Sequence, residues 1–312
     1  MKEHKGAHAF QSEHHTVVTI GTFDGVHVGH QKIIERLVNS AKAGNLESAI
    51  LTFFPHPRMV LQKDSDIKLI NTIQERKEIL EKSGIDHLIV HPFTVQFSRL
   101  SAQEFVRDIL VNRLKAKKVI IGYDHRFGRN RTADINDLRK FGEQYDFEVE
   151  EISKQDVEEV AVSSTKIRKA LMAGRVEKAN RYLSYPFALA GTVVKGKGLG
   201  REFGVPTANL NIEEDYKLVP ANGVYVVKSE IGGENYFGMM NIGTNPTVGG
   251  TEQTIETHFF DLQKDLYDTY LSIELLTRIR DEKKFDSVEK LKIAMKQDKA
   301  FSMQYIRDNY GG

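Results

Sequence analysis

The chain contains no cysteine among its 312 residues. This absence excludes disulfide bonds, thiolate catalysis and zinc or iron–sulfur sites built on cysteine. Nothing in the composition therefore requires an oxidising compartment, and we expect a cytoplasmic protein. The sequence also lacks any run of about 18 apolar residues, so we expect no membrane-spanning helix.

An excess of either charge is missing as well. The 44 Lys and Arg residues face 43 Asp and Glu residues, which leaves a formal net charge of +1. Because the net charge is close to zero, the overall charge gives no reason to expect a nucleic acid or a membrane surface as a partner. Any phosphate binding must come from local groups.

The length predicts two domains, because a single core rarely grows beyond about 250–300 residues. Residues 1–15 are polar and carry His4, His8, His14 and His15, and we expect a flexible N-terminal arm. A metal site on these histidines is the alternative, but a mobile segment offers no fixed ligand geometry. We expect the first domain over residues 16–184 and the second over residues 185–312.

The first domain alternates apolar runs with helical patterns. Residues 16–20, 49–53, 87–90 and 118–121 are rich in β-branched residues and read as buried strands. Thr72 with Glu75, and Ser101 with Glu104, have the spacing of helix capping boxes. This alternation predicts a Rossmann-like α/β domain with a parallel sheet covered on both faces.

The second domain has a different pattern. Glycine is frequent between Gly191 and Gly250, and short runs such as 223–227 and 236–240 are separated by turn residues. These features predict an antiparallel β-barrel. Residues 286–305 return to a helical period, which predicts a C-terminal helix packed on the barrel.

A first candidate site is the segment GTFDGVHVGH at residues 21–30, where a predicted strand meets a predicted helix. Helix N-termini attract anions, and Gly21 and Gly25 allow close approach of the backbone to a phosphate. His27 and His30 share a helix face and can donate hydrogen bonds to a phosphoryl group in transfer. Metal ligation or simple packing of the two histidines are the alternatives.

A second polar segment, SSTKIR at residues 163–168, begins another predicted helix. The hydroxyls of Ser164 and Thr165 and the guanidinium of Arg168 lie on one helical turn, which suits a polyphosphate. An ordinary helix start is the alternative, because Ser and Thr are common caps.

Together, the HxGH and SSTxxR motifs resemble the nucleotidyltransferase superfamily. TFFPHP at residues 52–57 and GYDHRFG at 122–128 are similar to its bacterial flavin adenylyltransferase branch. The resemblance implies that the phosphate of FMN attacks the α-phosphate of ATP and pyrophosphate leaves. It assigns His27 and His30 to the α-phosphate, and Ser164, Thr165 and Arg168 to the pyrophosphate.

The same resemblance implies further nucleotide-binding positions. A phosphate nucleophile is largely dianionic at neutral pH, so this reaction needs no general base. The chain departs from the family pattern at His125, where phenylalanine is usual, and at Phe54, where an acidic residue is common. These departures affect the flavin or adenine pocket rather than the phosphate site. The implied nucleotide-binding positions are Gly21, Phe23, Asp24, Gly25 and Asp124.

A third candidate site lies in the second domain. Gly196, Gly198 and Gly200 precede PTAN at residues 206–209. On an extended segment, the Thr207 hydroxyl and the Asn209 carbonyl point to one side, as suits a hard cation that bridges ATP phosphates. A strand that begins after a proline is the alternative.

The segment IETHFFD at residues 255–261 adds a carboxylate. Alternation places Glu256, His258 and Phe260 on one face of a strand and Phe259 on the other. A substrate alcohol, unlike a phosphate, must lose its proton, and a positioned carboxylate commonly accepts it. An exposed structural glutamate is the alternative.

These segments resemble riboflavin kinase, which implies a six-stranded barrel. The resemblance assigns Mg²⁺ and phosphate to Thr207 and Asn209, the general base on the ribityl 5′-hydroxyl to Glu256, and a place near the flavin to Arg280.

Taken together, the two resemblances imply a bifunctional riboflavin kinase and FAD synthetase that uses ATP as co-substrate for both steps. Riboflavin becomes FMN, and FMN becomes FAD. The two attacks need different alignments, so we expect separate sites. Alternatives are a flavin-sensing regulatory protein, or a riboflavin kinase with weak or altered adenylyltransferase activity. We expect small-molecule partners only, and a monomer or weak homo-oligomer.

Overall fold

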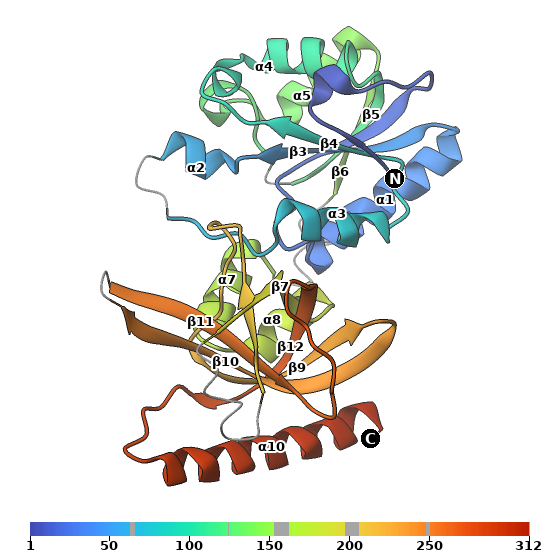
Figure 1. Cartoon of the computed structure of the whole chain (residues 1–312). Helices are drawn as coiled ribbons and strands as arrows, with labels where there is room; N and C mark the ends of the chain where they lie inside the picture. The colour runs from blue at the N-terminus through green and yellow to red at the C-terminus, as the bar shows by residue number, and fades with distance from the viewer. Residues whose placement is uncertain (63–65, 124, 153–161, 197–205, 248–249, 312) are drawn as a thin grey trace. The chain divides into compact units, whose positions relative to one another are not determined.

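The computed structural model describes residues 1–62, 66–123, 125–152, 162–196, 206–247 and 250–311. The chain forms two compact units, Met1–Ser164 and Thr165–Gly312 (Figure 1). The boundary between the units lies at residues 164/165, earlier in the chain than the expected boundary near residue 184. The reason is that helices α7 (Ser164–Met172) and α8 (Val176–Leu183) lie almost wholly in the second unit. The Asn180 side chain explains this: its amide donates to Leu275 O at 2.8 Å, on a barrel strand.

The first unit is a parallel six-stranded sheet in the order β1-β4-β3-β2-β5-β6, as the Rossmann-like prediction requires. Its strands are β1 (Lys2–His4), β2 (Thr16–Ile20), β3 (Glu47–Phe54), β4 (His87–Pro92), β5 (Ala116–Gly122) and β6 (Glu148–Ile152). Its helices are η1 (Ala7–Ala9), α1 (Val28–Gly44), α2 (Pro57–Leu61), α3 (Ile73–Glu81), η2 (Phe97–Arg99), α4 (Ala102–Glu104), η3 (Phe105–Val111), η4 (Arg129–Arg131) and α5 (Ile135–Tyr145).

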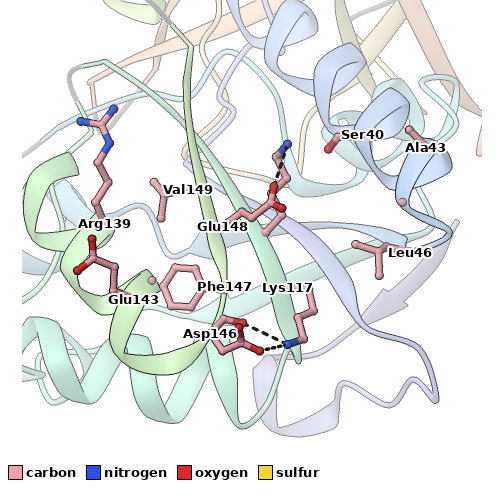
Figure 2. A pocket seen from close by; sticks show the side chains of 13 residues that line it. Ser40, Ala43, Leu46, Lys117, Arg139, Glu143, Asp146, Phe147, Glu148 and Val149 are labelled. Atoms are coloured by element: carbon pink, nitrogen blue, oxygen red, sulfur yellow. Dashed lines mark hydrogen bonds and ion pairs between the residues drawn. The ribbon is translucent and has the colours of Figure 1, made fainter.

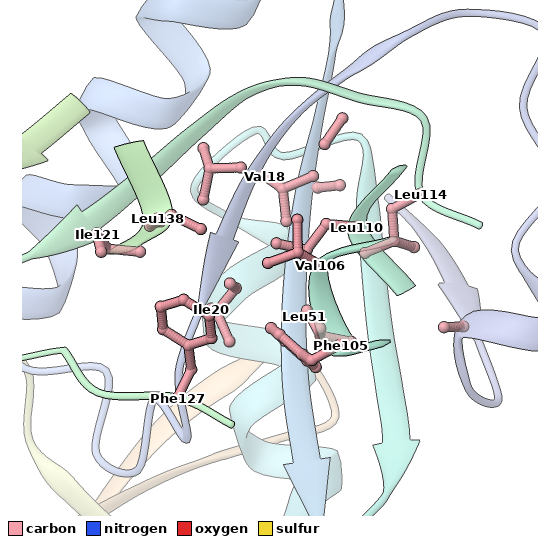
Figure 3. Packing of buried hydrophobic residues seen from close by; sticks show 14 of the residues in the cluster. Val18, Ile20, Leu51, Phe105, Val106, Leu110, Leu114, Ile121, Phe127 and Leu138 are labelled. Atoms are coloured by element: carbon pink, nitrogen blue, oxygen red, sulfur yellow. The ribbon is translucent and has the colours of Figure 1, made fainter. Parts of the chain in front are cut away.

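Two apolar layers cover the two faces of this sheet, because alternate residues of each strand point to opposite sides. On one face, Val18 and Leu51 pack against η3 and α5 through Val106, Leu110 and Leu138 (Figure 3). On the other face, α1 and α3 pack on strand residues that alternate with these, among them Val17, Ile50 and Ile120. Thr72 and Ser101 form the predicted capping boxes of α3 and α4.

The N-terminal residues are part of this unit, which corrects the expectation of a flexible arm. β1 pairs with β4 in parallel, from Lys2 opposite His87 to His4 opposite Ile89. Phe10 is buried, and the His4 Nε2 and His87 Nδ1 atoms lie 3.0 Å apart. An edge strand whose following residues enter the core is held by both its hydrogen bonds and its apolar contacts.

The second unit is a closed antiparallel barrel in the order β10-β11-β8-β7-β12-β9, which confirms the predicted fold. A C-terminal helix, α10 (Val288–Tyr310), packs on the outside of the barrel through Ile306, Met295 and Met303 against residues such as Val226 and Phe260. The barrel strands are β7 (Phe187–Val194), β8 (Ala208–Asn211), β9 (Gly223–Ile231), β10 (Glu234–Thr247), β11 (Gly250–Phe259) and β12 (Tyr270–Asp281).

Candidate active sites

The histidine motif lies where β2 ends and α1 begins. The carboxyl ends of the parallel strands form one edge of the sheet, and ligands of such folds gather there. The backbone of the motif is unusual, since Phe23 (φ 46°), Gly25 (φ 86°) and Val26 (φ 32°) all have positive φ. Only glycine adopts this region without strain, so Gly25 suits its position and Phe23 and Val26 must be held by their surroundings.

His27 caps α1, and its ring state follows from its contacts. The Nδ1 atom accepts a hydrogen bond from the backbone N–H of His30 at 3.4 Å. Burial lowers the pKa of His27 to about 4, so the ring is neutral at pH 7. Because Nδ1 is the acceptor, the single ring proton lies on Nε2 and can be donated to a phosphate oxygen.

His30 stacks on His27 with ring centroids 3.7 Å apart and an angle of 14° between the planes. Its pKa lies well below the ordinary value, first because of burial and then because of the neighbouring His27 and Arg76. Within the described part of the chain, its buried Nδ1 atom has no hydrogen-bond partner. Two stacked neutral rings therefore lie at the start of the helix, where a ring N–H and the free backbone amides could donate to a phosphate.

The other predicted positions of this motif differ in their exposure. Gly21 lies against the Phe23 ring. This buried ring packs against the His30 ring, with ring centroids 5.1 Å apart. Asp24 was expected to bind nucleotide, but its side chain is completely buried. Its carboxylate accepts backbone hydrogen bonds from Ile70 and Asn71 instead. Asp124 lies outside the described residues.

The second motif of the predicted adenylyl-transfer site heads α7. The Ser164 hydroxyl donates to the backbone oxygen of Asp24 at 2.9 Å. Thr165 is exposed and Arg168 is half-buried, and Ser164 and Arg168 lie on one helix face. Ile167 and Leu171 are buried next to these residues, because positions three and four apart are neighbours on a helix. Ser164, Thr165 and Arg168 therefore lie within the first turns of α7, beside its buried stripe.

His125, where the family usually has phenylalanine, is still used as an aromatic ring. It is half-buried and stacks on Phe127, with centroids 6.3 Å apart and planes at 22°. The imidazole therefore occupies the same kind of stacked position that a phenyl ring would fill.

The candidate kinase site lies on neighbouring strands of the barrel. Glu256 on β11 pairs in register with Asn209 on β8 and with Asn241 on β10. The Thr207 hydroxyl donates to the Glu256 carboxylate at 3.3 Å. The structure thus brings the three predicted residues, Thr207, Asn209 and Glu256, together. Sequence reasoning did not single out Asn241, whose nearness appears only through the strand register.

Burial alternates along β11 as the sequence predicts. Ile255, Thr257 and Phe259 are buried, whereas Glu256 and His258 on the opposite face are half-buried. The His258 Nδ1 atom lies 2.9 Å from Pro206 O, and burial lowers the pKa of this histidine. This contact ties the residue before Thr207 to the strand that carries Glu256.

Gly196 lies over the Asn209 side chain. A Cβ atom at Gly196 would lie 2.4 Å from Asn209 Cγ, so no larger residue fits there. The backbone therefore approaches the predicted cation ligand closely, and this explains the glycine. Gly198 and Gly200 lie outside the described residues.

Arg280 has a structural partner. Its guanidinium donates to both carboxylate oxygens of Asp298 on α10, at 2.9 Å from Nε to Oδ1 and 2.8 Å from Nη2 to Oδ2. It also lines a pocket of about 230 Å³ together with Phe285 and Ile293. This volume is below the roughly 300–1,000 Å³ of typical ligand sites.

A larger cavity of about 870 Å³ lies at the opposite edge of the parallel sheet from the histidines, at the amino ends of β5 and β6. Two of its lysines pair with acidic lining residues: Lys117 with Asp146, as Figure 2 shows, and Lys118 with Glu148 at 3.6 Å. None of the predicted site residues lines this cavity, so we do not take it as the candidate site.

Comparison with known proteins decides the family. The FAD synthetase family profile matches residues 9–166, and the riboflavin kinase profile matches residues 183–306. This chain belongs to the bifunctional riboflavin kinase/FMN adenylyltransferase family. The Listeria monocytogenes member is 38% identical over 90% of both chains. The Escherichia coli K12 member is 34% identical over 93% of this chain and 92% of its own.

The fold is also found in a solved structure. A crystal structure of a protein named macrolide-efflux protein, from Streptococcus pneumoniae, superposes with a TM-score of 0.88. It is 32% identical and covers 99% of each chain. The described residues of the present chain include no helix with the length and apolar character needed to cross a membrane.

Proposed function

We propose that this chain phosphorylates riboflavin with ATP in the barrel unit and adenylylates FMN with a second ATP at the histidine motif. The observation that carries the proposal is the presence of two different constellations. One offers neutral imidazole N–H donors at the start of a helix, and the other joins a carboxylate to two neutral oxygen ligands. The first suits attack by a phosphate, and the second suits attack by an alcohol.

In the kinase step, Glu256 accepts the proton of the ribityl 5′-hydroxyl. The hydroxyl oxygen then bonds to the γ-phosphorus of ATP while the bond to the β–γ bridging oxygen breaks, and ADP leaves. Thr207 and Asn209 supply a hydroxyl and an amide oxygen, the hard donors that Mg²⁺ prefers. When bound there, Mg²⁺ would neutralise charge on the ATP phosphates.

In the adenylylation step, an FMN phosphate oxygen bonds to the α-phosphorus of ATP and pyrophosphate leaves. His27 donates its Nε2–H to the α-phosphate, and His30 borders the same position. Ser164, Thr165 and Arg168 bind the leaving pyrophosphate. From the resemblance to riboflavin kinase we expect Arg280 near the flavin, and Arg280 also holds α10 through its ion pair with Asp298.

The test is a time course with the purified protein, riboflavin, ATP and Mg²⁺, in which the flavins are separated by chromatography. We expect FMN first and FAD after a lag. Absence of FAD when FMN is supplied directly would reject the adenylylation half. Absence of FMN would reject the kinase half. The cytoplasmic location and the weak or absent oligomerisation stay predictions.

A further inference from the structure

The loop that carries the histidines rests on a buried ion pair. Asp24 is 0% exposed and Arg76, from α3, is 2% exposed. Arg76 Nη2 lies 3.7 Å from Asp24 Oδ1. Such a pair costs desolvation energy, and either charge left alone would be strongly unfavourable. Both side chains are enclosed by protein, so we assign them a supporting role for the histidine loop.

Asp24 joins three segments of the chain. Its Oδ1 atom accepts hydrogen bonds from the backbone N–H groups of Ile70 at 2.9 Å and Asn71 at 3.2 Å. Its backbone oxygen accepts the Ser164 hydroxyl at 2.9 Å. One residue therefore fixes the histidine loop to the segment before α3 and to the first residue of α7.

Arg76 provides a second connection to the same loop. Its Nη1 atom donates to Thr52 Oγ1 at 3.4 Å. The Thr52 hydroxyl in turn donates to the backbone oxygen of Thr22 at 3.1 Å. The guanidinium thus supports the loop at Thr22 and at Asp24, on the two sides of the strained Phe23.

We propose that Arg76 is a positioning residue for adenylyl transfer, which acts through Asp24 and Thr52 to hold the histidine loop in its reactive shape. The inference rests on the proposed function of the first unit. A loop with Phe23 and Val26 at positive φ needs such support, since it would otherwise relax. A shift of about 1 Å in a reacting group can cost about 10²-fold in rate.

The experiment compares Arg76→Met, Arg76→Lys, Asp24→Asn and the double variant Asp24→Asn/Arg76→Met. FMN adenylylation and riboflavin phosphorylation are measured separately in each. Lys77→Met is the matched control, because Lys77 is the next residue of α3 and pairs with Glu3 at the surface. We expect Arg76→Met to lower kcat for adenylylation by about 10- to 100-fold, with KM for ATP and FMN changed less than about 3-fold.

Further outcomes separate positioning from contact. When Asp24→Asn is already present, we expect Arg76→Met to lower kcat for adenylylation by no more than about 3-fold. The reason is that the effects of two substitutions are not additive when the residues act together. Arg76→Lys should recover part of kcat, and kinase activity should stay unchanged throughout. A rise in KM without a fall in kcat, or an equal effect of Arg76→Met in both backgrounds, would overturn the proposal.

Folding of the first unit is checked by circular dichroism, and the kinase activity of the same molecules shows that the barrel unit is intact. If Arg76→Met does not fold, Arg76→Lys decides the question, since it keeps the charge but loses the forked geometry. Wild-type kcat in Arg76→Lys would then mean that Arg76 only neutralises Asp24, and the proposal would be wrong. A wild-type protein that cannot adenylylate FMN would reject the proposed function instead.

Discussion

The two candidate sites differ in the groups that they would present to phosphate. In the first unit, the proposed reactive side chains are neutral histidines, and the ion pair that supports their loop is buried. In the barrel, the proposed reactive residues Thr207, Asn209 and Glu256 are half-buried on β8 and β11 or next to them. The difference follows the nucleophile: a phosphate needs oriented donors, and an alcohol needs a base.

The largest effect is expected from Glu256→Gln, which removes the base and keeps the shape. Riboflavin phosphorylation should fall by about 10²- to 10⁴-fold, while adenylylation of supplied FMN continues at the wild-type rate. Initial rates of both steps, measured by chromatography, test this. Glu230→Gln, at an exposed position on β9, is the matched control. Loss of both activities in a folded protein would contradict separate sites.

Arg168→Ala should have the opposite effect to Glu256→Gln, with adenylylation lowered and riboflavin phosphorylation kept. Removal of the guanidinium should lower FAD formation by about 10²- to 10³-fold, because stabilisation of the leaving pyrophosphate is lost. FMN formation should not change. Lys169→Ala, on the exposed side of the same helix, controls for the loss of a positive charge. Wild-type FAD formation in Arg168→Ala would remove Arg168 from the site.

Acid should destabilise the first unit through His27. Its pKa is about 4 in the folded state, against about 6.5 when unfolded, so between these values the unfolded chain binds more protons. The contribution of His27 to the free energy of unfolding should therefore fall by roughly 2 kcal/mol from pH 7.5 to 5.

Thermal unfolding of wild type and of His27→Gln at both pH values measures this contribution. The wild type should lose more stability than the variant on acidification. Titration of His27 by NMR with a midpoint above pH 6 would contradict the assignment of a neutral ring.

The smallest effect on adenylylation is expected from a substitution at His125, one of the two departures from the family pattern. Since His125 already stacks on Phe127, His125→Phe should change the rate of adenylylation by less than about 3-fold. Steady-state kinetics with FMN and ATP test this. A change above 10-fold would show that the imidazole has a role beyond stacking.

The sequence predicted the main elements of both units because their apolar patterns are strong. It missed β1 and β6 for physical reasons. β1 is polar and depends on its pairing with β4. β6 (Glu148–Ile152) is acidic, and its charges are neutralised by residues far away in sequence, as in the ion pair between Lys118 and Glu150 at 2.7 Å. The apolar pattern of a short segment does not reveal a strand pairing or an ion pair with residues far away in the sequence.

The candidate sites were predictable where residue type and spacing carry the chemistry. The grouping of Thr207, Asn209 and Glu256 is an example: alternation indicated which side chains share a face, and the resemblance to riboflavin kinase joined the two segments into one site. The burial of Asp24 and its pairing with Arg76 were not predictable, because an arginine within an ordinary helix gives no sign of its partner. The contact between α3 and the histidine loop, through Arg76 and Asp24, is seen only in the folded structure.

A mixture of two variants tests whether the two reactions use separate sites. Glu256→Gln and Arg168→Ala proteins are incubated together with riboflavin, ATP and Mg²⁺, and the flavins are separated over time. We expect FMN made by Arg168→Ala to be converted to FAD by Glu256→Gln, although neither protein alone forms FAD from riboflavin. No FAD from a mixture of folded proteins would contradict separate sites.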